Sequence, residues 1–103
     1  MASTIRVRAI SNGDTTEVQA LIQHPMDSGF VKDDNGVIIP PHFIQQVIFE
    51  HDGKDVFVAD WGTGVSKDPY VKFSFKGGNK GDDLKISWVD NKGASDTTTA
   101  KIQ

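Results

Sequence analysis

Three histidines are the residues of this sequence best suited to binding a metal ion. They are His24, His42 and His51, and Met26 lies close to the first of them. Imidazole and thioether groups are ligands for copper, and imidazole is also a ligand for zinc. The spacing fits no known ligand pattern, because His42 and His51 lie at opposite ends of one predicted strand. We therefore expect strand-end histidines that contact solvent, and we predict no metal site.

Two acidic segments resemble calcium-binding loops only superficially. They are Asp33-Asp34-Asn35-Gly36 and Asp82-Asp83. An EF-hand loop needs ligands at alternate positions and a glutamate at its last position, and the corresponding position after Asp33 is Ile44. Asp and Asn side chains also stabilise turns by bonding to the nearby backbone, and we expect that role here.

The hydroxyl and glycine residues form no catalytic or nucleotide-binding motif. No serine lies in a Gly-x-Ser-x-Gly elbow, and the Thr97-Thr98-Thr99 segment has no evident activating base. Gly62-Thr63-Gly64 does not precede a predicted helix, so a dinucleotide site is unsupported. The sequence therefore predicts no catalytic residue, no cofactor and no enzymatic activity.

The composition narrows the class of protein. The chain has 103 residues, a net charge of −3, 37% hydrophobic residues and no cysteine. This length predicts one domain, residues 1–103, with one core. The acidic balance argues against nucleic-acid binding, and the lack of cysteine excludes disulfide scaffolds and thiolate chemistry. We expect no membrane span, and no signal peptide at the start, where apolar residues alternate with arginine.

Apolar side chains recur at every second position along most of the chain, which is typical of β-strands with one face in water. The pattern is clearest at 71–76 and 84–88 and recurs at 5–9, 18–22, 42–51, 54–61 and 98–102. In 42–51 it places Phe43, Val47 and Phe49 on one face, opposite Ile44 and Ile48. The side chains that we expect to face inward in the two clearest strands are Val71, Phe73, Phe75, Leu84, Ile86 and Trp88.

The turn sequences agree with antiparallel pairing of these strands. Asp52-Gly53 suits a two-residue hairpin, in which glycine adopts a positive φ. Asn91-Lys92-Gly93 suits a three-residue hairpin with glycine in the left-handed conformation. We therefore predict an all-β protein, an immunoglobulin-like two-sheet antiparallel sandwich of about seven strands. A small closed barrel is the alternative.

One connection is too long and too apolar to be an ordinary turn. It runs for 17 residues from Pro25 to Pro41 and contains Phe30 and the segment Val37-Ile38-Ile39, whereas structureless loops beyond about 12–15 residues are uncommon. Asn35-Gly36 suits a small hairpin within it. We expect this segment either to cap one end of the sandwich or to contact a partner.

Two blocks of sequence resemble the SoxZ family. The first is His24-Pro25-Met26-Asp27-Ser28-Gly29, followed by Lys32-Asp33 and Ile39-Pro40-Pro41-His42-Phe43-Ile44. The second is Ile86-Ser87-Trp88-Val89-Asp90-Asn91-Lys92-Gly93, followed by Ser95-Asp96-Thr97. Ser28 stands where the family often has threonine, which is a conservative difference.

The resemblance implies the fold, the partner and the pathway. SoxZ is the cysteine-free subunit of the SoxYZ carrier in bacterial thiosulfate oxidation, and its fold is an immunoglobulin-like sandwich. Its partner SoxY holds the sulfur intermediate on a carboxy-terminal Gly-Gly-Cys-Gly-Gly arm. That arm visits a cytochrome, a sulfate-releasing hydrolase and a sulfur dehydrogenase, which implies transient contacts with all three. The resemblance also implies a periplasmic location, reached by export with SoxY on the twin-arginine signal of SoxY.

The long connection supplies the candidate surface for SoxY, on the strength of its length and hydrophobicity alone. A stand-alone periplasmic immunoglobulin-like module that binds carbohydrate or copper remains the alternative function. A connection that only caps its own core remains the alternative structure. The candidate interface residues are Met26, Phe30, Val37, Ile38, Ile39 and, behind them, Trp61.

Overall fold

The computed structural model describes residues 3–103, and within them it contains seven β-strands and no helix. Each strand lies in a segment that alternates apolar and polar residues, which is the pattern that one buried face requires. No helix in this part of the chain is long and apolar enough to cross a membrane. The strands are β1 (Ile5–Ser11), β2 (Thr15–Ile22), β3 (Ile44–His51), β4 (Lys54–Asp60), β5 (Tyr70–Lys76), β6 (Asp83–Asp90) and β7 (Ser95–Lys101).

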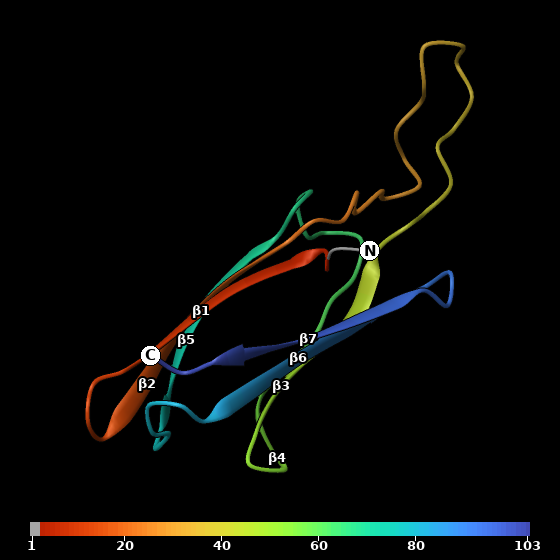
Figure 1. Cartoon of the computed structure of the whole chain (residues 1–103). Coiled ribbons are helices and arrows are strands. Elements are labelled where there is room, and N and C mark those ends of the chain that lie inside the picture. Colours follow the sequence, from red (N-terminus) through yellow and green to blue (C-terminus); the bar gives the residue numbers. More distant parts are fainter. Residues whose placement is uncertain (1–2) are drawn as a thin grey trace.

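The strands form two antiparallel sheets that face each other (Figure 1). One sheet has the order β1-β2-β5 and the other has the order β4-β3-β6-β7. Two separate sheets of this kind make an immunoglobulin-like sandwich and exclude the closed barrel. The predicted fold class is confirmed.

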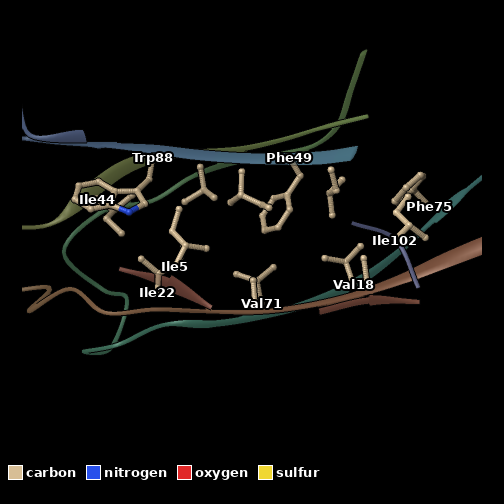
Figure 2. Close-up of a cluster of buried hydrophobic side chains, with 14 of the residues drawn as sticks. Ile5, Val18, Ile22, Ile44, Phe49, Val71, Phe75, Trp88 and Ile102 are labelled. Carbon is tan, nitrogen blue, oxygen red and sulfur yellow. The ribbon is translucent and has the colours of Figure 1, made fainter. Parts of the chain in front are cut away.

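The hydrophobic core lies between the two sheets, where side chains from both inner faces interdigitate (Figure 2). Phe49 at its centre is fully buried and stands edge-on to Phe73 at a ring distance of 4.8 Å. Five of the six inward positions predicted for β5 and β6 are buried, and the sixth, Phe73, is partly buried against the core. The prediction for these two strands is therefore confirmed.

The prediction for the 42–51 segment is wrong at its beginning. The strand starts at Ile44, and its register with β6 shifts between Ile44 and Gln46. Such a bulge reverses the faces of the residues on its two sides. Ile44 is therefore fully buried, like Val47 and Phe49, although simple alternation places it on the opposite face.

The two predicted hairpin turns are present. Asp52 and Gly53 join β3 to β4 with φ values of 54° and 75°, which are typical of a type I′ turn. Gly93 has a φ of 81° in the turn between β6 and β7. That turn includes Ala94 as well, because β7 begins only at Ser95.

The 25–41 connection leaves the sandwich and projects beyond one end of it (Figure 1). Its outer part is a small hairpin in which Lys32 pairs with Ile38 and the Ile39 amide donates to the Val31 carbonyl at 2.8 Å. Gly36 has a φ of 77° at the turn, as Asn35-Gly36 predicts. The outer part of the connection therefore does not cap the core.

Candidate functional site

The projecting hairpin exposes a group of large apolar side chains. Phe30 is 86% exposed, and Val31, Val37 and Ile38 are between 54% and 60% exposed. We call residues 30–38 the hairpin tip. An exposed apolar cluster on a projecting element is typical of a protein interaction site, because single exposed apolar residues are common but clusters are not.

The predicted interface residues divide into three groups in the structure. Phe30, Val37 and Ile38 lie at the exposed tip. Ile39 is half-buried, and Trp61 is half-buried against the core. Met26 is only 6% exposed and belongs to the core, where its Sδ accepts a hydrogen bond from the Ile44 amide at 3.3 Å. Met26 is therefore not on the accessible surface of the chain alone, and its place in the interface stays a prediction.

The base of the hairpin is tied to the sandwich by backbone and side-chain hydrogen bonds. Asp27 and His42 exchange two backbone hydrogen bonds of 2.7 and 2.9 Å. The Asn91 side chain donates to the Pro41 carbonyl at 2.9 Å and accepts from the Phe43 amide at 2.8 Å. The two legs are thus fixed to each other and to the turn between β6 and β7.

A buried carboxylate joins the two ends of the connection. The Nε2 atoms of His24 and His42 lie 3.1 and 2.8 Å from the same Oδ2 atom of Asp90. The other oxygen, Oδ1, accepts the Lys92 and Ala94 amides at 2.9 Å each. We call His24, His42 and Asp90 the carboxylate clamp.

Hydrogen bonds keep the Asp90 carboxyl of the clamp ionised. Burial raises the pKa of Asp90, but bonds from His24, His42 and the Ala94 and Lys92 amides outweigh burial and lower this pKa to about 2. The Asp90 side chain is therefore an anion at neutral pH although it is fully buried. A buried anion with every acceptor position used fixes the orientation of its partners.

The expectation of solvent-contacting histidines is wrong for His24, which is only 4% exposed. One feature of the sequence indicates that the two histidines lie close together. His24 precedes Pro25 and His42 follows Pro41, so the two histidines flank the long connection. Nothing local identified Asp90 as their common partner. His42 and His51 do lie at opposite ends of the sandwich, and His51 binds Asp82 there at 2.9 Å.

The clamp is a possible ligand set for a cation, since its three ligand atoms lie within 4.8 Å of one another. The hydrogen bonding of His24 argues against this role. Its Nδ1 accepts the Met26 amide at 3.2 Å, so the proton of the neutral ring is on Nε2 and is donated to Asp90. A metal on Nε2 would require either a doubly deprotonated ring or loss of the Met26 bond. The residues therefore fit a hydrogen-bonded clamp and do not fit a metal centre.

The family model described as "Sulphur oxidation protein SoxZ" matches residues 5–101 of the chain. No curated protein matches the chain. The matched region contains all seven strands, the hairpin and the clamp. The two sequence blocks that resemble the family meet in space, because one supplies His24 and His42 and the other supplies Asp90.

Proposed function

This chain belongs to the SoxZ family, and we propose that it is the non-catalytic subunit of a sulfur carrier, in which SoxY holds the sulfur. Family membership gives the chain a role in sulfur oxidation by the Sox system, with SoxY as its partner. The sequence contains no cysteine, so it has no thiol on which to carry a sulfur adduct. Its contribution is therefore binding and positioning.

We infer that the hairpin tip docks on SoxY, and the single observation that supports this is its exposed apolar cluster. Phe30, Val31, Val37 and Ile38 belong to this hairpin and are between 54% and 86% exposed. Aromatic and aliphatic side chains that enter a partner's surface dominate the affinity of most interfaces. A stable heterodimer buries about 1,600 Å² or more, so the tip would supply the anchor and neighbouring surface would supply the remainder.

The carboxylate clamp supports this proposal by fixing the base of the hairpin before the partner arrives. A free 17-residue connection would lose much conformational freedom on docking, and that loss weakens binding. Here His42 at one end and His24 at the other are already held by Asp90. The clamp therefore lowers the entropy cost of association.

Aspartate substitutions in the tip test the docking surface. Phe30→Asp or Ile38→Asp places a charge in an interface that would exclude water, so we expect at least a tenfold loss of SoxY affinity. The thermal midpoint of the chain alone should stay unchanged, because both side chains are exposed. The matched control is Val58→Asp, which changes an exposed apolar residue on β4 instead. Affinity is measured by calorimetry or by co-purification with SoxY.

Two outcomes would contradict the docking surface. Undiminished SoxY binding by both tip variants would remove the hairpin from the interface. Loss of binding by the Val58 control alone would move the interface to the outer face of the four-stranded sheet.

We also propose that the complex works in the periplasm and that the chain is exported together with SoxY. A chain that docks tightly on SoxY can cross the membrane as a folded complex on the twin-arginine signal of SoxY. The arm of SoxY would then meet the cytochrome, the hydrolase and the sulfur dehydrogenase there. Cell fractionation tests the export step, since deletion of SoxY should leave the chain in the cytoplasm.

A further inference from the structure

The charges of the chain are unevenly distributed between its two sheets. The three-stranded sheet β1-β2-β5 contains four of the 11 Lys and Arg residues but only one of the 14 acidic residues. This sheet is therefore basic in a chain whose net charge is −3. The four cations are all exposed and are Arg6, Arg8, Lys72 and Lys76.

Strand register brings these cations together on the outer face. Arg8 lies beside Gln19, which lies beside Lys72. Glu17, the single acid of the sheet, is already engaged, because its Oε1 lies 3.5 Å from Lys72 Nζ and accepts a hydrogen bond of 3.2 Å from Gln19. Among residues 3–103, Arg6 has no carboxylate within ion-pair distance.

Arg8 also lacks an ion-pair partner in this part of the chain, and the two guanidinium groups border an apolar strip. Arg6 lies beside Leu21, which lies beside Tyr70, and Tyr70 is 59% exposed. A shallow groove of about 240 Å³ is lined by Arg6, Arg8, Gln19, Leu21 and Tyr70. Arginine and tyrosine around a central apolar residue are the composition of interaction hot spots.

We propose that the outer face of the three-stranded sheet docks an acidic protein surface, whose carboxylates pair with Arg6 and Arg8. An apolar side chain of that partner would pack on Leu21 and Tyr70 in the groove. Arginine binds carboxylates through two parallel hydrogen bonds, so two unpaired arginines on one strand face suit a surface that presents two carboxylates. The neighbouring Lys72 and Lys76 would add long-range attraction.

Charge and shape favour a protein over other anionic partners. A nucleic acid or an anionic membrane would also meet the acidic remainder of the chain, which repels it. The four cations flank an apolar groove, and apolar side chains contribute little to contacts with a phosphate backbone. An acidic protein surface with a central apolar residue matches both parts of the face.

The expected interaction is weak and transient. Exposed ion pairs contribute little individually and are screened by salt, but they accelerate association. This face lies along the strands, whereas the hairpin tip projects from the end of the sandwich (Figure 1). If the proposed function holds, the face can meet an enzyme of the Sox system while the hairpin holds SoxY.

Charge reversal in the complex with SoxY tests the proposal. The cytochrome, the sulfate-releasing hydrolase and the sulfur dehydrogenase of the system are the probes, and their affinities are measured by interferometry at about 50 mM and about 300 mM salt. Arg6→Glu/Arg8→Glu should weaken binding of at least one probe tenfold at low salt and much less at high salt. The control Lys54→Glu/Lys80→Glu makes the same change in charge at exposed sites outside this sheet and should change affinity less than twofold.

Three results would overturn the proposal. The first is that the native and Arg6→Glu/Arg8→Glu complexes bind all three probes with equal affinity, or that the Lys54→Glu/Lys80→Glu control loses as much affinity as the arginine variant. The second is loss of SoxY itself by the arginine variant, which would make this face part of the subunit interface. The third is tighter Arg-dependent binding to duplex DNA or to phosphatidylglycerol vesicles than to any probe.

Failure of the proposed function would be recognisable separately. If the native chain does not pair with SoxY, the same titrations are made with the chain alone. Arg-dependent, salt-sensitive binding to a probe would then support the basic face while the carrier role fails.

Discussion

Asp90 is the residue on which the geometry of the hairpin base depends. Its Oδ2 atom is hydrogen-bonded to two histidines, one at each end of the long connection. Its Oδ1 atom accepts hydrogen bonds from two backbone amides in the turn between β6 and β7. An exposed aspartate could be replaced with little effect. This one is fully buried and anionic, so removal of its charge leaves polar neighbours without partners.

Asp90→Asn should destabilise the chain by about 2–4 kcal/mol. The amide nitrogen of asparagine is a donor. Depending on the side-chain orientation, it would face either the Lys92 and Ala94 amides or the Nε2–H of His24, which are all donors. That ring cannot change its tautomer freely, because its Nδ1 already accepts the Met26 amide. Chemical denaturation measures the loss. The control is Asp83→Asn, at an exposed carboxylate paired with Lys101, where we expect a change below about 1 kcal/mol. Equal effects of the two variants would show that the clamp contributes no more than a surface ion pair.

The clamp also predicts how stability depends on pH. The pKa of Asp90 falls from 3.8 to about 2 in the folded chain, so the folded state binds fewer protons than the unfolded state between these values. The contribution to stability is therefore complete above pH 3.8 and is lost as the pH falls toward 2. Its size is on the order of 2 kcal/mol.

Denaturation curves between pH 5 and pH 2 of the native chain and of Asp90→Asn test this prediction. The stability difference between the two proteins should shrink as the pH falls through the window given by the two pKa values. Hydrogen bonds from His51 lower the pKa of Asp82, and those from Thr4 lower the pKa of Asp96, but both proteins keep these groups. A difference that stays constant with pH would show that Asp90 titrates normally.

At the scale of elements, alternation in the sequence predicted the strands because each sheet has one face in the core and one in water. The alternation gave the wrong face for Ile44, because a bulge reverses the two faces of the strand there. No residue in the segment indicates a bulge. The alternation also missed the burial of Met26 and His24. These residues lie outside the strands, so their burial depends on which strand ends pack against them in the folded chain. For His24 this is the end of β6, where Asp90 contacts its ring.

Replacement of residues 30–40 by Gly-Asn-Gly tests whether the hairpin is an independent element. Gly29 and Pro41 pack against each other, so a short linker can close the gap. Among the large apolar residues removed, Phe30, Val31, Val37 and Ile38 are exposed and Ile39 is half-buried. A shorter loop also costs less entropy to close. We expect the free energy of unfolding to change by less than about 1 kcal/mol while SoxY binding is lost. A loss of several kcal/mol would mean that the tip stabilises the sandwich after all.

Gly78 closes the other end of the sandwich, in the loop between β5 and β6. Its φ is 83°, and a Cβ there would overlap the Thr16 side chain. Gly36 has a similar φ of 77° but has open space around it. Gly36→Ala should therefore cost only about 1 kcal/mol of backbone strain, whereas Gly78→Ala should cost about 2–4 kcal/mol. Equal midpoints in thermal denaturation would show that the loop moves to make room.

The whole molecule is elongated, with extents of 53 × 25 × 20 Å. Its radius of gyration is 15.4 Å, against about 13 Å for a compact chain of this length. The projecting hairpin contributes to the difference, and it places the apolar tip far from the core (Figure 1). An element of this kind is the part of a molecule that a protease reaches first.

Chymotrypsin should therefore cut the free chain first between Phe30 and Val31. Phe30 is the most exposed large apolar side chain in the described part of the molecule, and it lies outside every strand. Tyr70 is also exposed, but its backbone pairs with β2, so cleavage there should be slow and serves as the internal control.

Saturating SoxY should slow the cut after Phe30 at least tenfold, because a docked tip is inaccessible to the protease. Mass spectrometry of the fragments follows cleavage at both sites. A first cut at the same rate with and without SoxY would show that the tip remains free in the complex. The anchored hairpin would then be a surface for a third protein, and SoxY would bind a sheet face instead.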